Sequence, residues 1–181
     1  TNVKLLVQAL THSSASKSGK PNNERLEFLG DRILGLVIAD ELLRLNPKAS
    51  EGQIATYYNS LVKKETCSRI ALDMNLENAL NLGKSVSKNN ERKKIKMLGD
   101  AIEALIGAIY LDSGFKNVYK IIMDLWKDEI QSLLGMEISD EEFDKIMESF
   151  DVFHLDDLIH GYIKQNKDVI IQLLLDERDS K

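Results

Sequence analysis

Two stretches of the chain are apolar on nearly every helical face and yet carry acids at helical spacing. In the first, residues 24–39, the acids are Glu24, Glu27 and Asp31, spaced i, i+3 and i+7. Such positions stack on one face of a helix. A helix that is apolar all round is normally buried, so these carboxylates need a partner that offsets their charge.

The second stretch, residues 97–111, repeats the pattern with Asp100 and Glu103 at i and i+3. Both stretches also contain glycines, among them Gly30 in the first and Gly107 in the second. Because residues without a side chain let two backbones approach closely, we expect the two acidic faces to lie opposite each other.

Four carboxylates facing one another in an apolar setting require either protons or a cation. A set of oxygen ligands favours Mg²⁺, with Mn²⁺ as an alternative, over zinc. Such an ion can activate water and stabilise the leaving oxygen in phosphoryl chemistry. Spacing alone leaves two other interpretations open: salt bridges to Arg25 or Arg32, and an all-α nucleoside-triphosphate pyrophosphohydrolase.

The rest of the chain also favours helices, since it has only two prolines and no convincing alternating strand pattern. The sequence predicts an all-α fold. The helices expected are residues 3–9, 24–45, one that opens at the capping box of Ser50 and Gln53 and continues or breaks before Asn75, 95–111 and 118–134, with Gly135 after the last.

Charge divides the chain near Gly135. Residues 1–135 hold 19 Lys and Arg against 16 Asp and Glu, whereas residues 136–181 hold 5 against 13. We therefore expect a main domain over residues 1–135 and a short acidic helical appendage over 136–181, opened by a capping box at Ser139 and Glu142. A polyanion should bind the first part and avoid the second.

Three further observations bear on the compartment. No apolar run is long enough to cross a membrane, no signal peptide is visible, and Cys67 is the single cysteine. We expect an intracellular protein without a membrane partner, and the sequence does not separate cytoplasm from nucleus.

Three segments resemble the ribonuclease III family. Residues 23–31, Asn-Glu-Arg-Leu-Glu-Phe-Leu-Gly-Asp, are similar to its signature motif, residues 10–14 to its upstream Leu-Thr-His-x-Ser element, and residues 98–112 to its second motif. The run from Lys96 to Asp100 resembles the second motif of Dicer-type members. The resemblance covers roughly residues 3 to 130 and implies a ribonuclease III-type helical endonuclease domain.

The resemblance also implies roles for individual residues. Glu27, Asp31, Asp100 and Glu103 match the acids that bind the metal in this family. Glu24 and Glu51 match acids of RNA positioning and the outer metal shell, Lys96 a lysine beside the scissile phosphate, and Phe28 the aromatic of the dimer interface.

The activity implied is Mg²⁺-dependent hydrolysis of double-stranded RNA by a homodimer, which leaves 5′-phosphates and short 3′ overhangs. Duplex RNA is recognised mainly by shape, phosphates and 2′-hydroxyls. Two alternatives remain: a non-catalytic ribonuclease III-fold subunit that binds RNA or protein, and the pyrophosphohydrolase named above.

Outside the motifs, a basic cluster is expected to contact RNA. It comprises Lys84, Lys88, Arg92, Lys93 and Lys94 and lies just before Lys96. Arg32 stands where bacterial members usually have serine. Residues 136–181 do not resemble a double-stranded RNA-binding domain, and a protein partner is one role open to them. His154 and His160 in that segment have poor spacing for a metal and are expected to be surface or packing residues.

Overall fold

The computed structural model describes residues 2–16, 20–83 and 90–135, and all its regular elements are helices. The elements are α1 (Val3–Ala9), α2 (Glu24–Leu45), α3 (Glu51–Val62), α4 (Lys64–Asp73), the short 3₁₀ helix η1 (Leu76–Asn78) and α5 (Glu91–Leu134). The predicted all-α fold is confirmed for this part of the chain. The expected helices over 136–181, Lys84, Lys88 and the two histidines lie outside the described residues.

Local signals explain most of the helix ends. Ser50 and Gln53 form the predicted capping box at the start of α3. Gly135 adopts a left-handed conformation after α5, with φ 61°, which is the conformation that favours glycine at a helix end. α2 ends at Leu45, and its C-cap Asn46 lies directly before Pro47, as expected for a residue that precedes proline.

One helix boundary differs from the prediction, and a second decides between two courses that the sequence left open. The helix expected to begin at residue 95 begins at Glu91, because Asn90 accepts a hydrogen bond from the backbone N–H of Lys93 and caps it earlier. The helix that opens at Ser50 was expected to continue or to break before Asn75, and it breaks at Lys63, whose extended backbone separates α3 from α4. An N-cap asparagine is a weak signal beside the apolar periodicity on which the predicted start at residue 95 rested.

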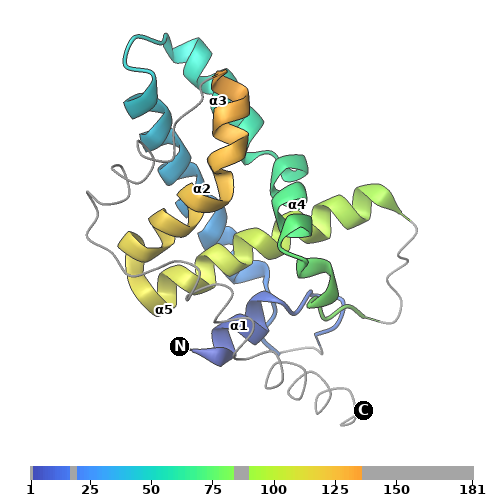
Figure 1. Cartoon of the computed structure of the whole chain (residues 1–181). Coiled ribbons are helices and arrows are strands. Elements are labelled where there is room, and N and C mark those ends of the chain that lie inside the picture. The colour runs from blue at the N-terminus through green and yellow to red at the C-terminus, as the bar shows by residue number, and fades with distance from the viewer. Residues whose placement is uncertain (1, 17–19, 84–89, 136–181) are drawn as a thin grey trace.

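α5 is the central element of the fold (Figure 1). Its first part crosses the middle of the molecule against α2 and α4. At Gly114 the backbone is non-helical, with φ 83° and ψ 176°, and the second part returns toward α3 (Figure 1). Every residue from Met97 to Ala108 is buried, so the second acidic motif lies inside the protein.

The core also holds polar groups that are fully paired. The indole N–H of Trp126 donates to the carbonyl of Leu61 at 2.9 Å and connects the second part of α5 to α3. Glu41 is 1% exposed, and it accepts hydrogen bonds from Arg44 and from the hydroxyl of Tyr119. Such pairing is what makes a buried carboxylate tolerable. None of the helices in the described ranges is both long and apolar enough to span a membrane.

Candidate metal centre

The two acidic motifs meet at the crossing of α2 and α5. Glu27 of α2 and Asp100 and Glu103 of α5 each offer a carboxylate oxygen, and these oxygens lie within 4.8 Å of one another. Asp100 and Glu103 are 3% and 2% exposed, whereas Glu27 is partly exposed at the edge. We refer to these three residues as the acid cluster.

Glycines make this meeting possible. A Cβ atom on Gly30 would overlap the backbone carbonyl of Glu103, and one on Gly107 would overlap the carbonyl of Leu26. Backbone therefore rests on backbone where the helices cross. The expectation that small residues bring the two acidic faces together is confirmed.

A lysine that the sequence analysis did not single out lies inside the acid cluster. The Nζ atom of Lys64 donates to Asp100 at 2.5 Å and to Glu103 at 2.7 Å, and it lies 3.4 Å from Glu27. Lys64 is the first residue of α4. A cation in the first turn opposes the helix dipole, and this was the one signal in the sequence that could have drawn attention to it.

Lys96 contacts the same cluster from the other side. Its Nζ donates to the second carboxylate oxygen of Asp100 at 2.5 Å, four residues along α5. The side chain is 70% exposed, so it lies at the rim rather than inside. The prediction that Lys96 lies on the acidic face of its helix is confirmed.

Burial raises the pKa values of the carboxyl groups in the acid cluster, whereas Lys64 and Lys96 lower them. Burial, assisted by the nearby Asp100, raises the pKa of Glu27, and burial raises the pKa of Glu103 despite Lys64. Burial acts in the same way on Asp100, but hydrogen bonds from Lys64 and Lys96 outweigh it and lower its pKa. Burial tends to lower the pKa of Lys64, yet hydrogen bonds to Asp100 and Glu103 raise it overall.

The donor set fits a hard divalent cation. All three donors are carboxylate oxygens, the ligands that Mg²⁺ and Mn²⁺ prefer. The three oxygens lie within 4.8 Å of one another, so a single ion between them could be shared by all three carboxylates.

Asp31, the fourth acid expected at the metal, is not part of this group in the described residues. Its carboxylate forms an ion pair with the neighbouring Arg32 and is 40% exposed. Because Asp31 and Arg32 are adjacent in α2, this ion pair gives the carboxylate a counter-charge at the surface. The guanidinium of Arg32 also lies 5.1 Å from the ring centroid of Phe28.

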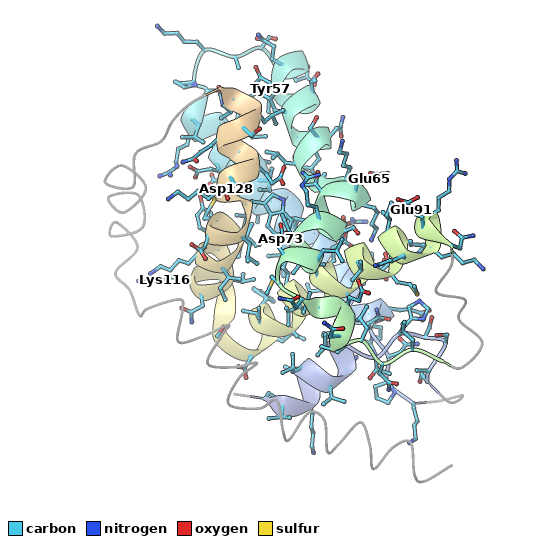
Figure 2. All side chains as sticks on the ribbon, turned by 45° about the vertical axis from the view of Figure 1, so that its right-hand side comes forward. Tyr57, Glu65, Asp73, Glu91, Lys116 and Asp128 are labelled. Carbon is cyan, nitrogen blue, oxygen red and sulfur yellow. The ribbon has the colours of Figure 1, made fainter. Side chains whose placement is uncertain are left out.

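The other predicted residues lie on the surface. Phe28 is 65% exposed. Glu24 and Glu51 are exposed in the first turns of α2 and α3. Arg92 and Lys93 are exposed where α5 begins, while Lys94 forms an ion pair with Glu77 at 2.7 Å. Figure 2 shows that Glu91, at this end of α5, and Glu65, at the start of α4, lie on the same side of the molecule.

Comparisons with known proteins agree on one family. Residues 2–129 match the family described as Ribonuclease-III-like. The chain is 49% identical over 128 residues to Ribonuclease 3 of Rhodobacter capsulatus, a match that covers 71% of the chain and 56% of that protein. It is 50% identical over 126 residues to Ribonuclease 3 of Dinoroseobacter shibae, covering 70% and 55%. The chain thus spans about half the length of these curated relatives.

A solved structure extends the likeness to three dimensions. The nuclease domain of ribonuclease III from Campylobacter jejuni superposes with a TM-score of 0.64 at 37% identity, over 75% of this chain and 91% of that one. That structure is described as showing flexibility in a region involved in dimer formation. A second structure of the same nuclease domain gives a TM-score of 0.63, over 76% and 89% of the two chains.

Proposed function

The chain belongs to the ribonuclease III family, and from this premise we propose that it is an endonuclease that hydrolyses double-stranded RNA at the acid cluster. The observation that carries the proposal is the convergence of Glu27, Asp100 and Glu103 on one point between two buried helices. A protein that only bound RNA would gain nothing from placing mutually repelling carboxylates there.

A divalent ion, Mg²⁺ or Mn²⁺, would be held by the acid cluster, with Asp31 as the fourth acid that the resemblance implies. When bound, it would supply an activated water and neutralise charge on the phosphate. The oxygen of water attacks phosphorus, the bond to the 3′-oxygen breaks, and that oxygen takes up a proton. The products are a 5′-phosphate and a 3′-hydroxyl.

Side chains of the chain itself would supply the charged ligand and the contacts to the RNA phosphates. Asp100 accepts hydrogen bonds from Lys64 and Lys96, which lower its pKa, so it offers an ionised carboxylate to a cation. Lys96 lies at the exposed rim and can donate to a phosphate oxygen of the scissile group. Arg92 and Lys93, at the start of the same helix, extend this positive rim for contacts along the RNA backbone.

We further propose a homodimer in which each subunit cuts one strand and so leaves short 3′ overhangs. Phe28 supports this arrangement, because a phenylalanine with 65% of its surface exposed is costly in water and favoured at interfaces. Leu36 and Leu43, also exposed on α2 at 59% and 61%, extend the apolar surface along the helix.

Two further roles implied by the sequence remain proposals. Glu24 and Glu51 are proposed as RNA-positioning and outer-shell acids, and residues 136–181 as a separate acidic segment open to a protein partner.

The proposal is tested by offering the chain four substrates in parallel: a labelled RNA duplex, the same RNA as a single strand, a DNA duplex and free nucleoside triphosphates. With Mg²⁺ we expect endonucleolytic cleavage of the RNA duplex alone, and none after EDTA is added. Binding without cleavage would favour the non-catalytic subunit. Hydrolysis of the triphosphates without RNA cleavage would favour the pyrophosphohydrolase.

A further inference from the structure

Lys64 occupies the centre of the acid cluster. Its ammonium nitrogen lies 2.5 Å from an oxygen of Asp100, 2.7 Å from one of Glu103 and 3.4 Å from one of Glu27. An ion bound by the same three oxygens would lie about 2.0 to 2.1 Å from each. The ammonium group and the ion therefore cannot lie between these carboxylates together.

The surrounding chain is shaped to let Lys64 reach this point. The side chain crosses α5 at Gly99, where an added Cβ would come within 2.8 Å of Lys64 Cδ and 3.3 Å of its backbone carbonyl oxygen. A side chain at residue 99 would thus obstruct the path. Lys64 also begins α4, a position that the helix dipole makes unfavourable for a cation, so its favourable partners are the three acids.

We propose that Lys64 is an exchangeable counter-ion of the metal centre: its ammonium group holds the three carboxylates together until a divalent ion displaces it. The inference rests on the proposed function in that it requires the acid cluster to bind metal. Lys64 thereby lowers the metal affinity, because binding must first break its hydrogen bonds to Asp100 and Glu103. Its side chain is 37% exposed, so the displaced ammonium group has solvent to move into.

Two opposite effects follow from removing this cation. Without metal, the carboxylates of Asp100 and Glu103 lose the ammonium group to which both are hydrogen-bonded, and the folded state is destabilised. With metal, no internal cation has to leave, so the ion binds more tightly. A lysine that merely supported the ligands would give the reverse result, since its loss would disorder them and weaken metal binding.

The test compares Mn²⁺ binding to the full chain, by titration calorimetry, in wild type, Lys64→Met and Lys63→Met. Lys63 is the exposed neighbour, so its replacement removes the same charge at nearly the same place in the sequence. We expect Lys64→Met to bind Mn²⁺ about 10- to 100-fold more tightly, the range over which one neighbour usually tunes a metal site. Lys63→Met should bind as wild type does. Equal or weaker binding by Lys64→Met overturns the proposal.

A measurement on wild type covers the case in which Lys64→Met does not fold without metal. Acetic anhydride is added to the full chain with and without Mn²⁺, and acetylation of each lysine is followed by mass spectrometry. Lys64 should become severalfold more reactive with Mn²⁺, while Lys63 should not change. Unchanged or lower reactivity of Lys64 overturns the proposal.

These experiments distinguish a failure of the counter-ion role from a failure of the proposed nuclease function. If the Mn²⁺ affinities follow the expected order but duplex RNA is not cleaved, the counter-ion role stands and the nuclease proposal falls. If RNA is cleaved while Lys64→Met gains no affinity, the nuclease proposal stands and the counter-ion role falls. If Mn²⁺ binds to none of the three proteins, the inference is overturned together with the metal centre.

Discussion

Gly30 of α2 rests directly on the backbone carbonyl of Glu103 in α5. This contact sets the distance between the two helices and so places Glu27, one turn before Gly30, beside Glu103. The position of one acid relative to the other thus depends on the absence of a side chain. The packing of the two helices and the geometry of the acid cluster therefore depend on the same backbone contact.

Gly30→Ala should therefore destabilise the protein, although alanine favours helices. Its methyl group would overlap a backbone atom that cannot rotate away, and we expect a loss of about 1 to 3 kcal/mol or more in the free energy of unfolding. Gly52→Ala is the matched control, because nothing lies within 4 Å of a Cβ there. It should be neutral or stabilising by up to about 1 kcal/mol. Urea unfolding measures both, and equal stabilities would refute the close-approach role of Gly30.

Much of the fold could be predicted from the sequence because its signals are local. The apolar helices, the capping box at Ser50 and the terminal Gly135 each depend on a few neighbouring residues. The meeting of the acidic faces was also predictable, since paired acids and glycines occur together in both helices.

The contact of Lys64 with the acid cluster could not be predicted from the sequence. Lys64 reaches Asp100 and Glu103 from a third helix, and no spacing along the chain encodes a contact between residues 36 and 39 positions apart. An ion pair with Arg32 was left open by the sequence, but periodicity could not show which acid would form it, and the structure places it at Asp31. Side-chain partners of charged residues depend on tertiary structure.

Cys67 should be inert in the folded protein. Its side chain is fully buried, and burial raises the pKa of its thiol from 9.0 to about 12. Iodoacetamide at pH 8 should leave native protein unmodified and should alkylate it fully in urea. Because Cys67 is the single cysteine, the intact mass reports on this thiol alone. Rapid alkylation of native protein would contradict its burial.

The raised pKa of the Cys67 thiol also predicts how the stability of the protein depends on pH. A raised thiol pKa means that the folded state keeps its proton after the unfolded state has lost it. The contribution of Cys67 to stability is therefore complete below pH 9 and falls as the pH rises from about 9 to 12.

Phe28→Ala should weaken the proposed dimer. Loss of an aromatic anchor at an interface typically costs at least about 1 to 2 kcal/mol, roughly a tenfold change in the dissociation constant. Leu72→Ala provides the control, since Leu72 is 41% exposed on α4. Sedimentation over a range of concentrations measures both variants. A wild-type chain that remains monomeric at every concentration would refute the role of Phe28.

The exposed basic residues at the start of α5 should contribute to RNA binding through phosphate contacts. Replacement of Arg92 and Lys93 by alanine should weaken duplex binding and reduce the slope of log affinity against log salt by about 1 per lost contact. Lys4 and Lys48 are exposed elsewhere, and their double alanine variant should keep the wild-type slope. Equal slopes in the two double variants would remove Arg92 and Lys93 from the RNA surface.

The central claim, that the acid cluster cuts duplex RNA, is tested most directly by single-turnover cleavage with Mg²⁺ in wild type, Glu103→Gln and Glu65→Gln. Glu103 is buried in the cluster, whereas Glu65 is exposed beside Lys64 at the start of α4 (Figure 2). We expect Glu103→Gln to cleave at least about 100-fold more slowly while still binding RNA, and Glu65→Gln to match wild type. Cleavage by Glu103→Gln at the wild-type rate would contradict the account.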